Sequence, residues 1–136
     1  VDSLTLAERI SRISGEEGCC PKIMFQVKLR EDANKGGFSP EELSKCWPSL
    51  VKLPNVKLFG LMTIAPQKLD SSERRNLFRD CRELANQLDL PECSMGMSHD
   101  WREAVAAGAT WVRLGSILFG VRSFYVNLTT DITKDD

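Results

Sequence analysis

The chain alternates between stretches with helical periodicity and short apolar stretches that are typical of β-strands. Residues 3–14 carry apolar side chains at helical spacing, and residues 22–29 alternate apolar and polar side chains, which indicates a strand. The pattern then repeats, with helices expected over 39–51, 71–88 and 101–107, strands over 56–65, 92–97 and 110–114, and a short helical turn over 115–120. Alternating helices and strands with short connections predict an α/β fold with a parallel sheet.

Local signals support the second of these helices. Ser39 is followed by Pro40, which suits the first helical turn, and by Glu42, which completes the sequence of a capping box. Pro48 lies inside the same apolar pattern. We expect it to kink or shorten the helix, because its ring clashes with the carbonyl of the preceding turn.

Composition excludes several classes of protein. Of the 136 residues, 42% are hydrophobic and 27% are charged, which is the balance of a globular domain rather than of collagen, a coiled coil or a disordered chain. The net charge of −1 lacks the basic excess of nucleic-acid-binding proteins. No apolar run approaches the ~20 residues that cross a bilayer, and no secretory leader opens the sequence. We therefore expect a cytoplasmic protein with no nucleic-acid or membrane partner.

The cysteines indicate free thiols rather than disulfides or a metal site. No C-x-x-C occurs, and His99 is the single histidine of the chain. A zinc site would need more ligands than this pattern offers, so no metal is expected. The five thiols are those of Cys19, Cys20, Cys46, Cys81 and Cys93.

The first candidate site is the segment Ser94-Met95-Gly96-Met97-Ser98, which ends a strand just before a helix. A helix N-terminus offers unpaired N–H groups and the positive end of the helix dipole. The Ser98 hydroxyl can join these groups in binding a phosphate. The alternative is that Ser98 serves only as the helix cap.

The second candidate site is the segment Trp111-Val112-Arg113-Leu114-Gly115-Ser116. An arginine inside an apolar strand is costly unless it meets an acceptor, so Arg113 is expected to face either a ligand or a carboxylate in a structural ion pair. Gly115 allows a ligand to approach the backbone closely, and Ser116 adds a hydroxyl and an N–H group.

Both segments fall on the last two strands of the chain, and in (β/α)₈ barrels the loops after the last two strands commonly build a phosphate site. No G-x-G-x-x-G follows a strand, so a dinucleotide-binding fold is disfavoured. The first helix has no complete strand before it, and the four expected strands therefore look like part of a larger barrel.

Five segments closely resemble the pyridoxal-phosphate homeostasis proteins of the YggS/PROSC type, with matching order and spacing. They are Gln26-Val27 with 34–38, 58–64, 94–100, Glu103-Ala104 with Ala107-Gly108, and 112–120. The resemblance covers residues 1–122. The polar remainder, 123–136, is expected to form a tail outside the core.

The resemblance implies a (β/α)₈ TIM barrel of the alanine-racemase N-terminal-domain type, of which this chain is roughly the C-terminal half. It also implies pyridoxal 5′-phosphate (PLP) as cofactor, held at the C-terminal ends of the strands. By family analogy, Ser98, Gly115 and Ser116 bind the phosphate. The same analogy places Arg113 opposite the pyridine nitrogen and adds Met97 to the cofactor-binding residues.

The sequence departs from the family pattern at the site. Gly36 stands where the family usually has serine, and Lys28 stands where it usually has asparagine. The family's Schiff-base lysine lies on the first strand of the barrel, and none of Lys22, Lys28 or Lys35 matches its motif. We assign no Schiff-base lysine and no catalytic residue to this chain.

The resemblance implies a role in intracellular PLP homeostasis and amino-acid balance, without catalytic turnover. An arginine at the pyridine nitrogen disfavours protonation of that nitrogen and weakens the ring as an electron sink. This is compatible with a carrier and also with a PLP-dependent amino-acid racemase, which is the main alternative. A sugar-phosphate barrel enzyme is less favoured, because the strand ends offer Asp100 and little else for proton transfer. A barrel fragment without activity is the remaining possibility.

Part of a barrel has two free sheet edges, so we expect self-association of this chain. The strand at 22–29 is expected to be one of the edges. Phe25, Val27, Leu61 and Ile64 are expected to face the interior of the barrel.

Overall fold

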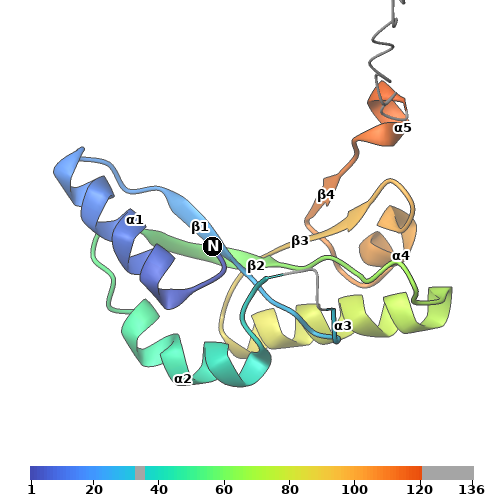
Figure 1. Ribbon diagram of the computed structural model, residues 1–136, viewed down its shortest axis with the longest axis horizontal. Coiled ribbons are helices and arrows are strands. Elements are labelled where there is room, and N and C mark those ends of the chain that lie inside the picture. The colour runs from blue at the N-terminus through green and yellow to red at the C-terminus, as the bar shows by residue number, and fades with distance from the viewer. Residues whose placement is uncertain (33–35, 121–136) are drawn as a thin grey trace, which may run out of the picture.

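The computed structural model describes residues 1–32 and 36–120, so the predicted tail at 123–136 lies outside the described residues (Figure 1). Helices and strands alternate along the whole described chain, as the sequence predicts. In chain order they are α1 (Leu4–Glu16), β1 (Lys22–Gln26), α2 (Pro40–Leu50), β2 (Lys57–Met62), α3 (Ser71–Gln87), β3 (Glu92–Met97), α4 (Trp101–Ala106), β4 (Trp111–Arg113) and α5 (Ser116–Phe119).

The strands form one four-stranded parallel sheet in the order β1-β2-β3-β4. Each strand pairs with the next in the sequence, with Phe25 beside Leu61 and Met62 beside Ser94. This is the consecutive order of a (β/α)₈ barrel, and it confirms the predicted α/β fold. Helices α2 and α3 lie on one side of the sheet, and α4 lies beside α3 (Figure 1).

The hydrophobic core lies between the sheet and these helices. Phe25 is fully buried and makes edge-on contacts at 6.0 Å with the rings of Phe38 and Trp47, the latter on α2. Leu61 is fully buried beside Phe25 in the adjacent strand. Other buried core side chains are Leu43, Leu50, Leu77, Phe78, Ala85 and Met95.

The expectation that Phe25, Val27 and Leu61 face the interior of the barrel is wrong. The three side chains are buried on the helix side, because α2 and α3 cover that face of the sheet. Alternating apolar residues identify a strand with one buried face, but they do not say which side that face is on. Ile64 follows β2 and lines a cavity at the end of the strand.

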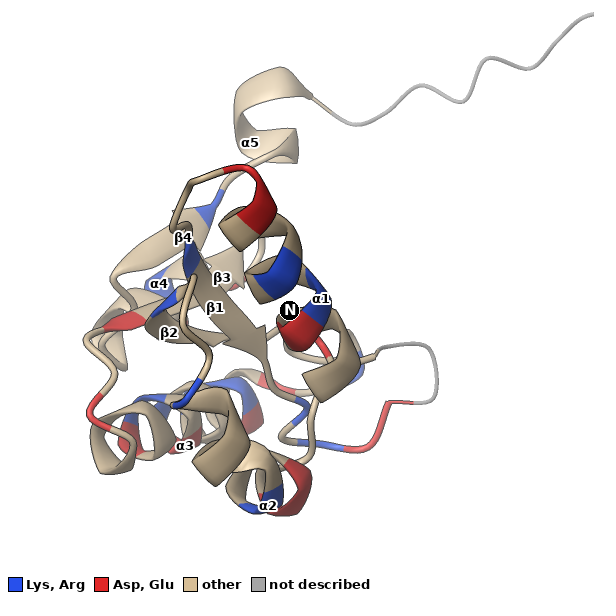
Figure 2. Ribbon diagram, turned by 90° about the vertical axis from the view of Figure 1, so that its left-hand side faces the viewer, with Lys and Arg blue, Asp and Glu red and all other residues tan. Residues whose placement is uncertain are grey.

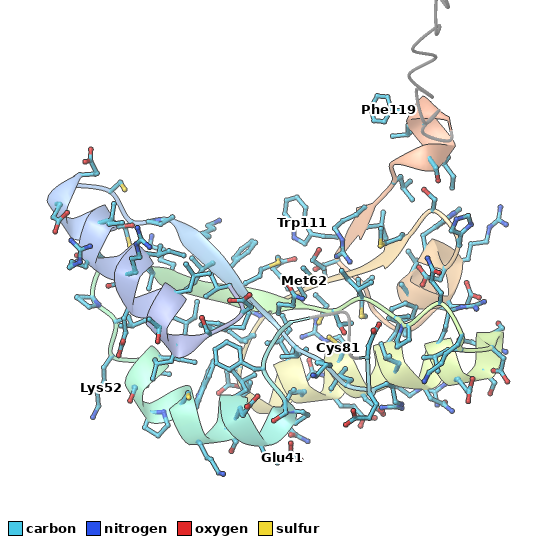
Figure 3. All side chains as sticks on the ribbon, viewed as in Figure 1. Glu41, Lys52, Met62, Cys81, Trp111 and Phe119 are labelled. Atoms are coloured by element: carbon cyan, nitrogen blue, oxygen red, sulfur yellow. The ribbon has the colours of Figure 1, made fainter. Side chains whose placement is uncertain are left out.

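The opposite face of the sheet carries no helix among the described residues. It holds a shallow cavity of about 290 Å³ lined by Lys22, Met24, Phe59, Ser94, Trp111, Val112 and Arg113. The Lys22 ammonium lies 4.6 Å above the Phe59 ring, and Phe59 contacts Trp111 edge-on at 6.4 Å. Figure 3 shows Trp111 on this open side and Cys81 on α3, beneath the sheet. We refer to this side as the open face.

β1 and β4 are the outer strands of the sheet within the described residues, as expected for the segment at 22–29. The chain start lies against the outer edge of β1. The Val1 ammonium donates to the Met24 carbonyl at 2.9 Å, and the Gln26 N–H donates to the Val1 carbonyl at 2.8 Å. This backbone pairing has the form of a strand ladder.

The capping box of α2 is confirmed. The Glu42 N–H donates to Ser39 Oγ, and the Ser39 N–H donates to the Glu42 carboxylate. Pro48 lies inside α2, and the helix ends two residues later at Leu50.

Basic and acidic residues are interspersed along α1 to α4 (Figure 2). Of the free cysteines, Cys81 and Cys93 are buried and Cys19 and Cys20 are exposed. The described residues contain no cluster of three or more potential metal ligands. Within the same residues, no helix has the length and hydropathy needed to span a bilayer.

Candidate functional site

The connection from β3 to α4 places Ser98 away from the helix that it was expected to cap. Asp100 occupies the N-cap position of α4 without a side-chain cap, and its carboxylate instead accepts from the Met97 N–H at 2.7 Å. Ser98 Oγ accepts a hydrogen bond from the Ile117 N–H at 3.3 Å. The alternative that Ser98 serves only as the cap of α4 is therefore wrong, because the turn at 97–100 directs its hydroxyl towards α5.

This hydrogen bond brings the two predicted segments together. Gly115 occupies the N-cap position of α5, and Ser116 is the first residue of that helix. Ser98 Oγ takes the Ile117 N–H and the Gly115 carbonyl takes the Leu118 N–H, so within the described residues the Ser116 N–H is the group in the first turn of α5 left available to a ligand. A Cβ added at Gly115 would have no atom within 4 Å. The hydrogen bond places Ser98 beside the first turn of α5, and we call Ser98, Gly115 and Ser116 together the α5 cup.

Arg113 lies at the end of β4 and is held by two neutral acceptors. Its Nη1 donates to Ser94 Oγ at 2.7 Å, and its Nη2 donates to the Thr63 carbonyl at 2.9 Å. Among the described residues no carboxylate is close enough to form an ion pair with Arg113. The structural ion pair considered from the sequence is therefore replaced by hydrogen bonds to neutral groups.

Burial lowers the pKa of the Arg113 guanidinium, and the nearby Asp100 carboxylate partly opposes this effect. The group stays cationic at neutral pH because the ordinary arginine pKa is above 12. A partly buried cation with no anionic partner attracts a ligand that carries an acceptor or a negative charge. Arg113 also lines the cavity on the open face.

Thr63 extends this hydrogen-bonded set to the remaining strand. Its hydroxyl donates to the Val27 carbonyl at 2.9 Å, and the side chain is almost completely buried. The set therefore contains Val27 after β1, Thr63 after β2, Ser94 on β3 and Arg113 on β4. These contacts join all four strands near the end of the sheet where the α5 cup lies.

A larger cavity, of about 570 Å³, opens beside Met97 at the C-terminal ends of β2 and β3. Its other lining residues are Ile64, Ala65, Pro66, Gln67, Arg74, His99 and Asp100. Met97 is 43% exposed, so its side chain is accessible from this side. Met97 therefore lies near the other predicted site residues, next to Ser98 in the same turn.

Sequence reasoning missed Thr63 and Ser94 as partners of Arg113. Both offer neutral acceptors, whereas a carboxylate was the protein partner expected from the sequence. Ser94 within β3 has a signal in the sequence, its hydroxyl, but Thr63 has none, because it accepts through its backbone carbonyl. A single partly buried arginine on a third strand needs such acceptors.

The comparison with known proteins gives one family over most of the chain. Residues 1–123 match the alanine racemase N-terminal domain. A pyridoxal phosphate homeostasis protein of Synechocystis is 45% identical over 128 residues, which cover 90% of this chain and 59% of the relative. The chain thus spans a little over half the length of this relative.

Solved structures agree with the fold. PipY of Synechococcus elongatus without PLP superposes with a TM-score of 0.85 and 49% identity, over 88% of this chain and 59% of that protein. The PLP-bound structure of the same protein gives a TM-score of 0.84 and 47% identity, over 88% and 58%. The four strands are therefore part of a (β/α)₈ barrel, and the chain belongs to the alanine racemase N-terminal domain family.

Proposed function

We propose that this chain is the PLP-binding portion of a protein of intracellular PLP homeostasis, which holds the cofactor and supports amino-acid balance without catalytic turnover. The observation that carries the proposal is the contact of Ser98 with the first turn of α5. It brings together the residues expected to bind a phosphate. The similarity to a PLP homeostasis protein and to the PLP-bound PipY structure supports the choice of ligand.

The α5 cup suits a phosphate group. In the proposed complex the Ser98 and Ser116 hydroxyls and the Ser116 N–H group donate to phosphate oxygens. Gly115 leaves space for the phosphate to approach the backbone, since no atom lies within 4 Å of the missing Cβ. Met97 precedes Ser98 in the same turn and is 43% exposed, and in the proposed complex it would exclude water from the ring of the ligand.

Arg113 suits the pyridine end of the cofactor. When bound, PLP supplies an aldehyde that reacts with primary amines and a pyridine ring that withdraws electrons. Ser94 and Thr63 fix the Arg113 guanidinium at the ends of the strands, where it would donate to the ring nitrogen. A cation at that position keeps the nitrogen unprotonated and so reduces electron withdrawal. This favours a carrier over an enzyme.

PLP binding is tested by equilibrium dialysis with the 136-residue chain. Gly115→Val is expected to weaken binding at least tenfold because it fills the cup, and Ser98→Ala about fivefold because one hydrogen bond to a charged group is lost. Ser49→Ala, an exposed change on α2, is the matched control. Equal affinity of all three variants would show that the cup does not bind the phosphate.

Covalent trapping tests the absence of a reactive lysine. After PLP and borohydride, we expect no stoichiometric label at a single lysine. Lys22 is the critical position, because it lines the same cavity as Arg113 on the open face. Specific labelling of Lys22 would contradict the assignment.

The alternative is racemase-like activity, which Arg113 also allows. It is separated from the carrier role by measuring the interconversion of L- and D-alanine with the chain and with the full-length PipY relative. We expect no rate above that of free PLP. Turnover well above this background would replace the carrier proposal with the enzymatic one.

A further inference from the structure

We propose that a groove between α3 and α4 binds a small organic molecule with two anionic groups, at a site separate from the α5 cup. The α3–α4 groove has a volume of about 470 Å³, which is within the range of small-molecule sites. Its lining residues are Arg75, Ser98, His99, Trp101, Arg102, Glu103 and Ala106.

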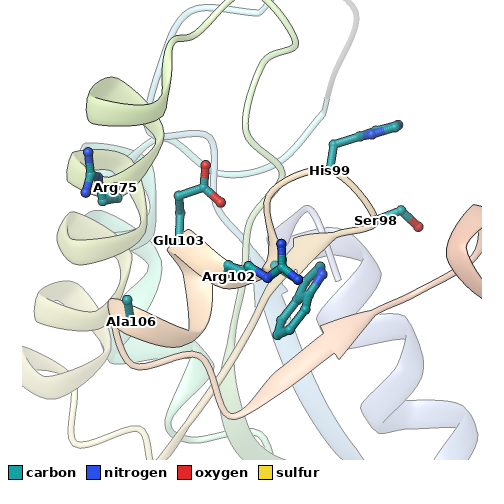
Figure 4. Close-up of a pocket in the computed structure, with 7 residues that line it drawn as sticks. Arg75, Ser98, His99, Arg102, Glu103 and Ala106 are labelled. Atoms are coloured by element: carbon teal, nitrogen blue, oxygen red, sulfur yellow. The ribbon is translucent and has the colours of Figure 1, made fainter.

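Three elements form the walls of the groove (Figure 4). Arg75 lies on α3 at one side, and Ser98 and His99 lie on the β3–α4 connection at the other. Arg102 and Glu103 of α4 lie between them. In Figure 4 the Ser98 side chain points away from Arg75, and its hydroxyl meets the Ile117 N–H. Ser98 therefore borders both sites, and its hydroxyl faces the α5 cup rather than Arg75.

The acidic residue that lines the groove, Glu103, is already paired with a neighbouring arginine. Glu103 accepts from Arg74 Nη2 at 2.8 Å and from the Ser71 hydroxyl at 3.2 Å. Its side chain is 18% exposed, and that of Arg74 is 24% exposed. The hydrogen bond from Arg74 is the main cause of the lowered pKa of Glu103, so the carboxylate stays ionised and paired. Glu103 is thus not available to neutralise the other arginines.

Arg75 and Arg102 are left as the unpaired charges of the groove. Arg75 Nε donates to the Ser71 carbonyl at 3.3 Å, and the Arg102 guanidinium lies 5.0 Å from the centre of the Trp101 ring. Over residues 1–32 and 36–120, neither arginine forms an ion pair with a carboxylate. The ring contact restrains Arg102 without using its N–H groups in an ion pair.

These contacts define the chemistry of the ligand. Each guanidinium presents paired N–H donors that match a carboxylate or a phosphate. Two such groups lining one groove favour a ligand with two anionic groups, while Ala106 and the Trp101 ring provide apolar surface for the part between them. A dicarboxylate and a diphosphate share this chemistry.

Isothermal titration of the 136-residue chain with pyrophosphate and, separately, with succinate tests the site. We expect saturable binding of at least one probe, which identifies the anionic group preferred. Arg75→Ala and Arg102→Ala are each expected to weaken that binding about tenfold or more, because a hydrogen-bonded charge is removed. Arg102→Lys keeps the charge and is expected to retain part of the affinity.

Two controls locate the bound probe. Arg79→Ala removes an exposed arginine one turn further along α3, outside the groove, and is expected to leave the affinity unchanged. Gly115→Val fills the α5 cup, so it too is expected to leave probe binding in the groove unchanged. Circular dichroism of each variant confirms that the fold is retained.

Two results would overturn the proposal. One is the absence of binding of both probes to the unmodified chain. The other is binding that Gly115→Val abolishes while Arg75→Ala and Arg102→Ala leave it unchanged, since the probe would then occupy the α5 cup. No PLP is used, so failure of the proposed PLP site leaves the result interpretable.

Discussion

The two faces of the sheet differ in what covers them. On the helix side, Phe25, Leu61 and Met95 are completely buried. On the open face, Phe59 is half-buried and Trp111 is 53% exposed. Both faces carry large apolar residues, so hydrophobicity alone does not explain the difference.

The comparison indicates that the helix side stabilises the fold, whereas the open face provides groups for ligand binding. The buried side chains of the helix side account for most of the apolar area that folding removes from water. The open face carries Lys22, Ser94 and Arg113 among its apolar residues and is bordered by the α5 cup. The fold is therefore expected to tolerate changes on the open face better than changes on the helix side.

Two phenylalanines test this difference most strongly. Phe25→Ala on the helix side is expected to lower the free energy of unfolding by about 3–5 kcal/mol, because it leaves a cavity in the core. Phe59→Ala on the open face is expected to cost about 1 kcal/mol or less. Urea denaturation followed by circular dichroism measures both. Equal losses would show that the open face is a second core.

The next largest difference in stability is expected between substitutions at two glycines. A Cβ at Gly60 would lie 2.2 Å from the Glu92 carbonyl oxygen in the adjacent strand. Gly60→Ala is therefore expected to force β2 and β3 apart, at a cost of about 2 kcal/mol. Gly115→Ala meets no neighbouring atom and is expected to change stability by less than about 0.5 kcal/mol. Thermal unfolding compares the two, and a stable Gly60→Ala variant would contradict the close packing of these strands.

The open face is also expected to drive self-association. It exposes apolar side chains, and the described residues leave β4 as a sheet edge, whereas the chain start pairs with part of the outer edge of β1. Light scattering of the isolated chain is expected to show species larger than a monomer. Trp111→Lys is expected to shift the distribution towards the monomer, whereas Val51→Lys on the helix side, also at an exposed position, is the control. A monomer with a cooperative thermal transition would contradict this expectation.

The smallest effect on stability is expected at the Arg74–Glu103 ion pair, and this effect depends on pH. The pKa of Glu103 is lowered in the folded chain, chiefly by the hydrogen bond from Arg74. The pair therefore stabilises the fold above the pKa of an unfolded glutamate, and this contribution is lost as the pH falls through the lower, folded value. Glu103→Gln is expected to cost about 0.5 kcal/mol at neutral pH and nothing in strong acid. An unchanged difference at all pH values would point to packing instead.

The sequence was sufficient to predict the elements and their order. Helical spacing gives α3 to within one residue, and the strand at 92–97 agrees with β3. Alternation with helices predicts a parallel sheet, whereas the consecutive order of its strands was expected from the resemblance to a family of (β/α)₈ barrels. The side of the sheet on which Phe25 lies could not be predicted, because it depends on where α2 packs. Helical spacing over 101–107 predicts that Val105 points inward with Ala104, but Val105 is 50% exposed, since α4 has only six residues and buries chiefly Ala104.

The sequence predicted which residues belong to the candidate site, but it did not predict the contacts between them. Ser98 and Gly115 were identified from the motif, and the structure brings their segments together. The partner of Ser98 is 19 positions away in the sequence and belongs to the backbone of Ile117. The second acceptor of Arg113 is also a backbone group, the Thr63 carbonyl, 50 positions away. Backbone partners at such separations leave no signal in residue type.

Arg113 has a consequence for the shape of the sheet. It lies on β4, whereas Thr63 follows β2, and these two strands are separated by β3. The guanidinium is rigid and planar, so reaching Ser94 and Thr63 together limits how far apart the ends of these strands can lie. Drawing strand ends together on one side bends a sheet towards that side, and such curvature is needed for strands to close into a barrel. A lysine at this position would keep the charge, but its single ammonium would hold the bend less firmly.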